Sequence, residues 1–312
     1  MKAISKKRLK KFMFGNVEED GFFTKLILYV ILIGISFIFL YPILQMTVRS
    51  FMGLEDLIDP TVIWIPSELV VGNYESAAEV LKFWDALGDS ILVSLLPTLC
   101  AVISSSLIAY GFAQFNFPGK KVLFGAVIAV FLVPSLLMSI PTFVLYKNYG
   151  FLNSLKAYVI PALCGFGLRQ PVFIFIFYQF FKMIPNELSE SAEVDGANAF
   201  QVFLKIAIPS AVPAIIICTL YSFVWYWNET TLAISYLGTE YTTLQIAVSR
   251  FESIYKELFP GGNVGMDEVS QSFNESVLFA GTMLSILPLL VLYAFTQKWF
   301  VESADRAGIA GN

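Results

Sequence analysis

The sequence predicts an all-α, polytopic membrane protein with six transmembrane helices and both termini in the cytoplasm. Of its 312 residues, 57% are hydrophobic and only 14% are charged, and the mean hydropathy is +0.71. A soluble domain of this length would be far less apolar. The chain also contains six apolar runs that approach or exceed the roughly 20 residues a helix needs to cross a bilayer. These observations predict a multi-pass membrane protein.

Residues 1–25 form a basic N-terminal tail that holds seven Lys or Arg residues. Cytoplasmic segments next to transmembrane helices carry an excess of Lys and Arg, so this tail is expected on the cytoplasmic side. The other basic residues outside the expected spans divide equally, six on each predicted side. The predicted orientation therefore depends on the tail and on one polar loop described below.

Residues 26–312 are expected to form one transmembrane domain, in which polar segments separate six spans. The first holds no charged residue, and the third contains Pro134 and Pro141, which predict a kink. Segments 49–89 and 238–274 are too polar to span and are expected on the outer side. The spans are expected at 26–48, 90–113, 122–146, 157–181, 210–237 and 276–296.

Composition also argues against several classes of function. The net charge is −4 with no basic stripe, so nucleic acid is not an expected partner. The chain has no histidine, and Cys100, Cys164 and Cys218 lie inside apolar runs without metal-ligand spacing. The polar segments offer no paired catalytic groups. We therefore expect no catalytic residue, metal site or bound cofactor in this chain.

The segment 182–209 is the most polar part of the second half of the chain and lies between two expected spans. Its charges cannot lie in hydrocarbon, so it must meet water or another protein. Asn186 is a candidate N-cap, and Glu187 and Glu190 are expected in the first helical turn, where carboxylates favour the positive end of the helix dipole. A first short helix is therefore predicted from about residue 186.

A glycine is expected to divide this loop in two. Gly196 suits the left-handed conformation that ends many helices. Asn198 with Gln201 three residues later has the spacing of a capping box, which predicts the start of a second short helix. The alternative is that the segment is an ordinary cytoplasmic connection between two spans.

The same segment resembles the EAA loop of ABC importer membrane subunits: Glu-Ala-Ala, a spacer, Gly, a second spacer, and Ile-any residue-Leu-Pro. The chain has Glu190-Ser191-Ala192, Gly196 and Ile206-Ala207-Ile208-Pro209, with Ser191 and Ile208 in place of the usual Ala and Leu. The resemblance implies a cytoplasmic coupling helix that docks on a partner ATPase. The coupling residues it implies are Glu190, Ser191, Ala192, Asp195, Gly196, Ala197, Ile206 and Pro209.

The similarity extends from about residue 73 to the C-terminus and is to carbohydrate-importing permeases of the maltose-transporter type. It implies the type I permease fold of ABC importers in a bacterial or archaeal cell (inner) membrane. It also implies a homologous second permease subunit in a heterodimer, two ATPase subunits that use ATP and Mg, and an extracytoplasmic solute-binding protein. The tail departs from the family pattern at Ser303. The matching stretches include Asp89-Ser90, 104–112, Phe117-Pro118-Gly119, Trp227-Asn228-Glu229, Thr242-Thr243-Leu244 and 297–301.

Five side chains in the expected fourth and fifth spans are candidates for a substrate pathway. Tyr221, Trp225, Asn228 and Glu229 recur at spacings of three and four, so they are expected on one helix face. Aromatic rings beside amide and carboxylate groups suit a sugar, although the same rings could serve helix packing or the membrane interface. Arg169 and Glu229 are expected roughly 20 to 24 Å into the membrane. We expect them to pair or to line the outer mouth of the pathway together, unless each reaches the headgroups separately.

Three functions remain open at this point. The first is a permease subunit for a carbohydrate, above all an oligosaccharide. The second is an ABC permease for an amino acid, polyamine or peptide. The third, a self-sufficient secondary transporter or an integral membrane enzyme, predicts inverted repeats or ionisable relays within the spans, whereas only two charged residues lie deep in them. We expect the first.

Overall fold

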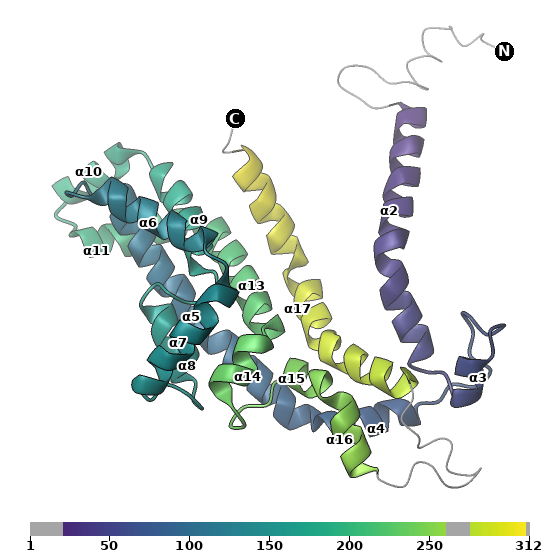
Figure 1. Cartoon of the computed structure of the whole chain (residues 1–312). Helices are drawn as coiled ribbons and strands as arrows, with labels where there is room; N and C mark the ends of the chain where they lie inside the picture. Colours follow the sequence, from purple (N-terminus) through teal and green to yellow (C-terminus); the bar gives the residue numbers. More distant parts are fainter. Residues whose placement is uncertain (1–20, 260–274, 310–312) are drawn as a thin grey trace, which may run out of the picture. The chain divides into compact units, whose positions relative to one another are not determined.

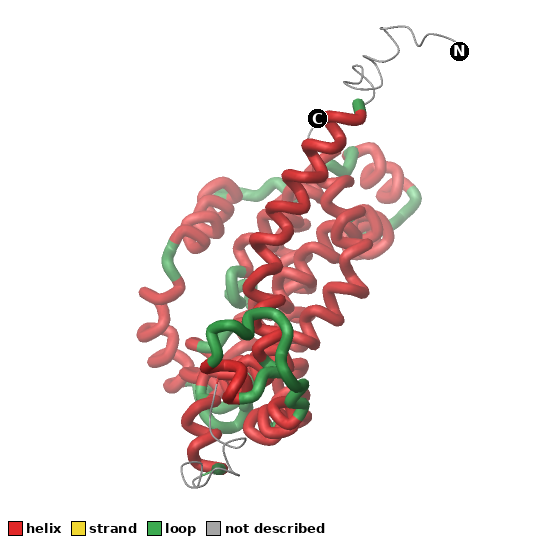
Figure 2. The backbone as a smooth tube through the Cα atoms, turned by 90° about the vertical axis from the view of Figure 1, so that its right-hand side faces the viewer, coloured by secondary structure: helices red, strands yellow, loops and turns green. Residues whose placement is uncertain are grey.

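The computed structural model describes residues 21–259 and 275–309, and every regular element in these ranges is a helix (Figure 2). The chain divides into two compact units, Met1–Glu75 with Gly261–Met283 and Ser76–Pro260 with Leu284–Asn312. In chain order the helices are α2 (Phe22–Arg49), α3 (Leu54–Ile58), α4 (Gly72–Leu81), α5 (Phe83–Gln114), α6 (Lys120–Leu132), α7 (Ser135–Asn148), α8 (Lys156–Leu163), α9 (Gln170–Lys182), α10 (Asn186–Val194), α11 (Ala199–Val202), the π-helix η1 (Phe203–Ala207), α12 (Ile208–Ser210), α13 (Val212–Asn228), α14 (Thr231–Leu237), α15 (Leu244–Ser249), α16 (Phe251–Leu258) and α17 (Glu275–Ile309) (Figure 1).

The first unit is built on α2, which covers the first expected span. None of its 28 residues is buried within the chain. Hydrogen bonds join the start of α4 to the residues that follow α2. The buried side-chain amide of Asn73 donates to the carbonyl oxygens of Ser50 and Met52, both at 3.0 Å. Ser50 also forms a hydrogen bond of 2.7 Å with the Tyr74 hydroxyl. These bonds satisfy the backbone where α2 ends.

The second unit is organised around α5, which packs against α8, α9 and α13. Its packing face carries small residues, including the buried Ser104, Ser105 and Ala109, which let neighbouring backbones approach closely. Phe173 and Phe177 of α9 are fully buried in the same core. The polar stretch between α9 and α13 is therefore attached to a packed helical core.

Three helices in the described ranges are long and apolar enough to cross a membrane: α2, α5 and the Glu275–Trp299 part of α17. Two bent helix pairs, α6 with α7 and the Ala199–Ser210 stretch with α13, raise the number to five if each counts as one span. The protein is therefore an all-helical membrane protein. The number six, and the sides on which the termini lie, stay predictions.

The expected third span, 122–146, is broken rather than kinked. α6 ends at Leu132 and α7 begins at Ser135, and the two helix directions differ by 107°. Val133 is extended because the following proline disfavours helical backbone at the residue before it, and Pro134 has no N–H to continue the helix. Pro141, by contrast, lies inside α7.

A single helix over the expected fourth span, 157–181, is wrong. The structure forms α8 and α9 with a non-helical turn at 164–169. Gly165 has a φ of +82°, a left-handed conformation that a helix cannot contain. Arg169 also has a positive φ, of 51°. This arginine therefore precedes α9 instead of lying in the middle of a helix.

A single helix over the expected fifth span, 210–237, is also wrong. α13 ends at Asn228, Glu229 adopts an extended backbone, and α14 begins at Thr231. The helix axis also bends by 78° where the loop joins α13. The second span is expected to begin at residue 90, but its helix, α5, begins seven residues earlier at Phe83.

The last described helix is longer than the expected sixth span. The sixth span is expected to finish at residue 296, but α17 continues to Ile309. Most of the basic tail, residues 1–20, lies outside the described residues, and so does 260–274, part of a segment expected on the outer side.

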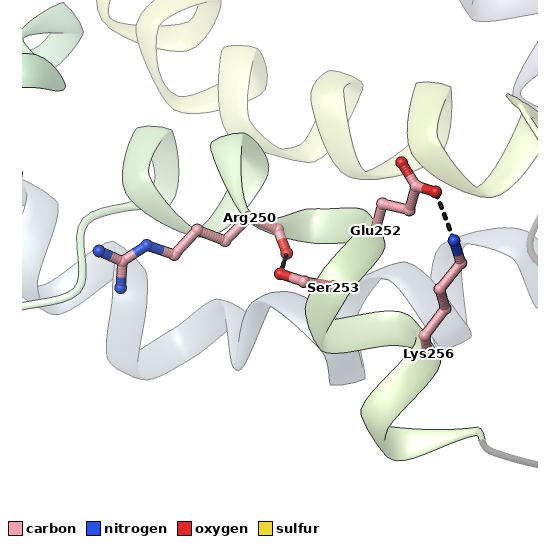
Figure 3. A network of polar contacts seen from close by, with 4 residues as sticks. All are labelled: Arg250, Glu252, Ser253 and Lys256. Carbon is pink, nitrogen blue, oxygen red and sulfur yellow. Dashed lines mark hydrogen bonds and ion pairs between the residues drawn. The ribbon is translucent and has the colours of Figure 1, made fainter.

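The described part of segment 238–274, which is expected on the outer side, contains α15 and α16. On α16, Lys256 and Glu252 form an ion pair of 2.6 Å, one helical turn apart (Figure 3). The Ser253 hydroxyl donates to the Arg250 carbonyl oxygen at 2.7 Å, while the Arg250 side chain extends away from the ion pair (Figure 3). Tyr255 lies on the buried face, where burial raises its pKa. α16 is therefore an amphipathic helix with a solvated charged face.

Candidate functional site

The polar loop between α9 and α13 begins with α10. Asn186 is the first helical residue, so the N-cap position belongs to Pro185 and the predicted Asn186 cap is wrong. Glu187 lies in the first turn, as predicted, whereas Glu190 lies one turn further on. The proline explains the difference, since its fixed φ near −60° and missing N–H suit the start of a helix.

Gly196 closes α10 in the predicted left-handed conformation, with a φ of +86°. The Ala197 amide donates to the Ala192 carbonyl oxygen at 2.9 Å, and the Gly196 amide donates to that of Glu193 at 3.0 Å. These two bonds form a Schellman motif, which satisfies carbonyls left over at the end of a helix. Nothing lies within 4 Å of a Cβ placed on Gly196, so the glycine is required by backbone conformation rather than by space.

The second half of the loop starts with the predicted capping box. The Asn198 side chain accepts a bond of 2.9 Å from the Gln201 amide, and the Gln201 side chain accepts one of 2.8 Å from the Asn198 amide. Residues Phe203–Ala207 then form a π-helix, in which the Ile208 amide donates to the Phe203 carbonyl oxygen five residues earlier. Such wide turns inside helices occur frequently at functional sites.

The structure places most of the predicted coupling residues on the surface of this loop. Glu190, Ser191, Asp195, Gly196 and Pro209 are exposed, Ala192, Ala197 and Ile206 are partly buried, and the Ser191 hydroxyl donates to the Leu188 carbonyl oxygen at 3.1 Å. Sequence analysis missed the apolar side chains beside them. Val194 is 88% exposed, and Leu188, Phe200 and Leu204 are also exposed. The sequence does hold a signal for them: apolar residues recur at helical spacing in a segment that must meet water, which indicates an exposed apolar face.

A buried aromatic ring of the loop packs into the helical core. Phe203 is 5% exposed, and its ring lies 5.0 Å from that of Tyr110 on α5 and 6.3 Å from that of Phe181 on α9. The Gln114 side chain of α5 donates to the Phe181 carbonyl oxygen at 2.9 Å. The loop is therefore joined to α5 and α9 through packed aromatic rings.

Three of the predicted pathway residues come together at α9 and α13. The Arg169 guanidinium lies 5.0 Å from the ring centre of Trp225, a cation–π contact. The Trp225 ring stacks on Phe173 at 5.2 Å, and Tyr221 lies 5.8 Å from it. Arg169 and Tyr221 are exposed, so this cluster presents a cation and aromatic rings on an open face of the unit.

The other two predicted pathway residues behave differently. Asn228 is exposed, and its side-chain amide donates to the Val224 carbonyl oxygen at 2.9 Å. Glu229 lies beyond the end of α13, and its carboxylate accepts a bond of 2.9 Å from the Leu232 amide. Glu229 therefore caps α14 instead of sharing the face of Tyr221. Among the described residues, no ion pair joins it to Arg169.

A cavity of about 420 Å³ lies in the second unit beside this cluster. Helix breaks contribute to its wall, through Val133 and Pro134 from the first break and Gly167 and Arg169 from the second. Its polar lining comes from Thr142, Arg169 and the tyrosines Tyr146, Tyr158, Tyr226 and Tyr236. Non-helical backbone is tolerated inside a membrane where it is covered by protein or lines a cavity.

The long apolar helices and the order of the elements define the class of this chain as a helical membrane protein with the fold of an ABC importer subunit. The described fold matches, with a TM-score of 0.70, a chain in the crystal structure of a bacterial ABC transporter involved in the import of the acidic polysaccharide alginate; the match covers 88% of this chain and 95% of that one at 23% identity. The chain belongs to the family of binding-protein-dependent transport system inner membrane components, which matches residues 101–305.

Characterised relatives match over nearly their whole length. The chain is 28% identical to the polygalacturonan/rhamnogalacturonan transport system permease protein YtcP of Bacillus subtilis, over 92% of this chain and 98% of that protein. It is 26% identical to the arabinooligosaccharides transport system permease protein AraQ of Halalkalibacterium halodurans, over 89% and 93%. It is 25% identical to the diacetylchitobiose uptake system permease protein DasC of Streptomyces coelicolor, over 97% and 100%. The family predicted from the EAA-like loop is confirmed.

Proposed function

We propose that this chain is the membrane-spanning permease subunit of an ATP-driven importer, and that it forms a translocation pathway for a carbohydrate together with a homologous partner permease. A solute-binding protein delivers the substrate on the outer side of a bacterial or archaeal cell membrane. The chain crosses that membrane six times, with both termini in the cytoplasm. Relatives named for arabinooligosaccharides, polygalacturonan and diacetylchitobiose support an oligosaccharide as the substrate.

The observation that carries this proposal is the exposed loop anchored by Phe203. The exposed face of this loop carries Glu190 and Asp195 beside exposed apolar side chains such as Val194. This combination is suited to docking on another protein. The inner face of the loop is packed on α5 and α9. Two partner ATPase subunits bind and hydrolyse ATP with Mg, and their closure displaces the loop. The chain itself performs no catalysis and binds no cofactor.

The substrate pathway runs past the face that carries Arg169, Tyr221, Trp225 and Asn228. Sugar C–H faces lie against aromatic rings, and hydroxyl groups bond to the guanidinium and the amide. Arg169 serves this face through its contact with Trp225. Glu229 serves it indirectly, by capping α14 next to Asn228.

The proposal is tested by reconstituting the chain with its partner permease, ATPase subunits and solute-binding protein in liposomes. A panel of labelled oligosaccharides is offered, and both ATP hydrolysis and uptake are measured. We expect at least one oligosaccharide to stimulate both activities. One relative, 27% identical, is the osmoprotective compounds uptake permease protein GgtD of Synechocystis, so osmolytes belong in the same panel. Stimulation by those osmolytes, or by an amino acid, polyamine or peptide, and by no carbohydrate would favour a non-sugar importer.

A further inference from the structure

The side chain of Gln170, the first residue of α9, is fully buried and holds three parts of the second unit together. Its Oε1 accepts a bond of 2.5 Å from the Gly167 amide. Its Nε2 lies 3.0 Å from the Ala162 carbonyl oxygen on α8, and 2.6 Å and 3.1 Å from the Ser104 and Ser105 hydroxyls on α5. A buried amide is costly unless both ends are satisfied, and here both are.

Two buried side chains accept hydrogen bonds from backbone amides of the turn at 164–169. On one side Gln170 accepts from the Gly167 amide; on the other, the Tyr226 hydroxyl accepts a bond of 3.0 Å from the Leu168 amide. A Cβ on Gly167 would lie 2.7 Å from the Gln170 oxygen and 2.8 Å from the Tyr226 oxygen. The backbone of Gly167 is therefore clamped between these two side chains, which leaves no room for any other residue type.

The clamped turn determines where Arg169 lies. Arg169 follows the clamped residues directly and has a left-handed φ of 51°, which is uncommon for a residue with a long side chain. This backbone conformation directs its guanidinium over Trp225. The same turn also forms part of the cavity wall through Phe166 and Leu168. Without the clamp, the cost of the left-handed conformation would favour relaxation of the turn.

We propose that Gln170 is the positioning residue of the substrate pathway: by clamping the 164–169 turn between α5, α8 and Tyr226, it holds the Arg169 guanidinium on Trp225. The role rests on the proposed transport function. Gln170 touches no substrate and acts through Arg169. A residue needed only for packing would affect folding and transport independently of Arg169.

A double-mutant cycle in the reconstituted importer separates these roles. Arg169→Asn removes the guanidinium with a residue that tolerates the left-handed backbone, and Gln170→Met removes the hydrogen bonds at similar volume. We expect each variant to lower substrate-stimulated turnover about tenfold, and the double variant to be no worse than either, with the KM for the binding protein unchanged. Independent effects would multiply to about a hundredfold loss, and that result would overturn the proposal.

A second measurement needs no transport. Arg169→Cys is introduced into the importer after replacement of Cys100, Cys164 and Cys218, and its rate of labelling by a maleimide is measured with Gln170 intact and again after the added substitution Gln170→Met. We expect at least a fivefold change in rate; an unchanged rate contradicts the clamp. If Gln170→Met does not assemble, the pair Ser104→Ala and Ser105→Ala weakens the same clamp and takes its place. A failure of every sugar to stimulate transport would refute the proposed substrate, whereas the labelling rate tests the clamp independently of it.

Discussion

The carboxylate of Asp89 accepts a hydrogen bond of 2.8 Å from the backbone amide of Thr242, 153 residues further along the chain. Next to it, the Ser90 hydroxyl oxygen accepts a bond of 2.8 Å from the Leu244 amide. Two of the stretches that carry the family resemblance, Asp89-Ser90 and Thr242-Thr243-Leu244, therefore meet. Together they fix the loop before α15 to the first turns of α5.

Removal of the Ser90 hydroxyl is expected to destabilise the protein. In Ser90→Ala the buried Leu244 amide loses its acceptor, which costs about 1 to 3 kcal/mol of the free energy of unfolding. The measurement is the melting temperature of the purified chain in detergent. Ser253→Ala is the matched control, since the exposed Ser253 hydroxyl donates to the carbonyl oxygen of Arg250, the N-cap residue of α16 (Figure 3). Equal melting temperatures for the two variants would contradict the structural role of this bond.

Substitution of Gly196 tests the hinge of the loop. The left-handed backbone costs a residue with a Cβ roughly 1 to 2 kcal/mol, and more if the side chain is β-branched. Gly196→Val is therefore expected to abolish transport while the protein still inserts into the membrane. Gly196→Asn is expected to retain most transport, because asparagine tolerates this conformation and a Cβ meets no neighbour. Uptake is measured in vesicles with equal amounts of each variant, and full uptake by Gly196→Val would refute the hinge.

The local structure of the loop could be predicted from the sequence because its signals are local. The Gly196 helix end and the Asn198–Gln201 capping box each depend on residues within three or four positions, and both are found where the sequence predicts them. The exposed apolar face of the loop was missed because Val194 and Phe200 are apolar residues in a polar segment, and only their exposure distinguishes them from core residues.

The broken helices could not be predicted from hydropathy. A window of apolar residues has the same mean hydropathy whether or not the backbone turns at Gly165, and a buried hydrogen-bonded turn needs no polar sequence around it. The turn at 164–169 is stable because Gln170 and Tyr226 bind its amides, and the second of these contacts joins residues 58 positions apart. The predicted depth of Arg169 assumed a continuous helix, and the structure has a turn there instead.

The exposed apolar face of the loop is expected to bind the ATPase subunits. Val194→Asp places a charge where the side chain is 88% exposed, so folding should be unaffected, but an apolar contact would be lost. We expect the ATPase subunits to dissociate from the variant at lower concentrations of salt and detergent than from the unchanged protein. We also expect transport to fall at least tenfold. Co-purification yield measures the association. Leu258→Asp, an exposed apolar residue on α16, is the control and should leave the complex intact.

Two phenylalanines of the loop, three residues apart, are expected to behave in opposite ways. Phe203→Ala removes a buried ring from between α5 and α9 and should cost about 3 to 5 kcal/mol of the free energy of unfolding. Phe200 is 60% exposed, so Phe200→Ala should leave the melting temperature unchanged and weaken the association with the ATPase. Thermal unfolding and co-purification of both variants measure the difference. If Phe200→Ala destabilises the chain as much as Phe203→Ala, the anchor has been assigned to the wrong ring.

Charge reversal distinguishes a cation–π contact from an ion pair at Arg169. The guanidinium lies over Trp225, and the Glu229 carboxylate accepts from the Leu232 amide, so each charge has its own role. Arg169→Glu and Glu229→Arg should each reduce uptake, and the double reversal should restore none of it. Glu229→Gln keeps an acceptor for the Leu232 amide and should retain most activity. If the double reversal instead transports nearly as well as the unchanged protein, the two residues pair during transport. An ion pair keeps its attraction when its two charges are exchanged. A carboxylate placed over an indole ring, by contrast, loses the cation–π attraction.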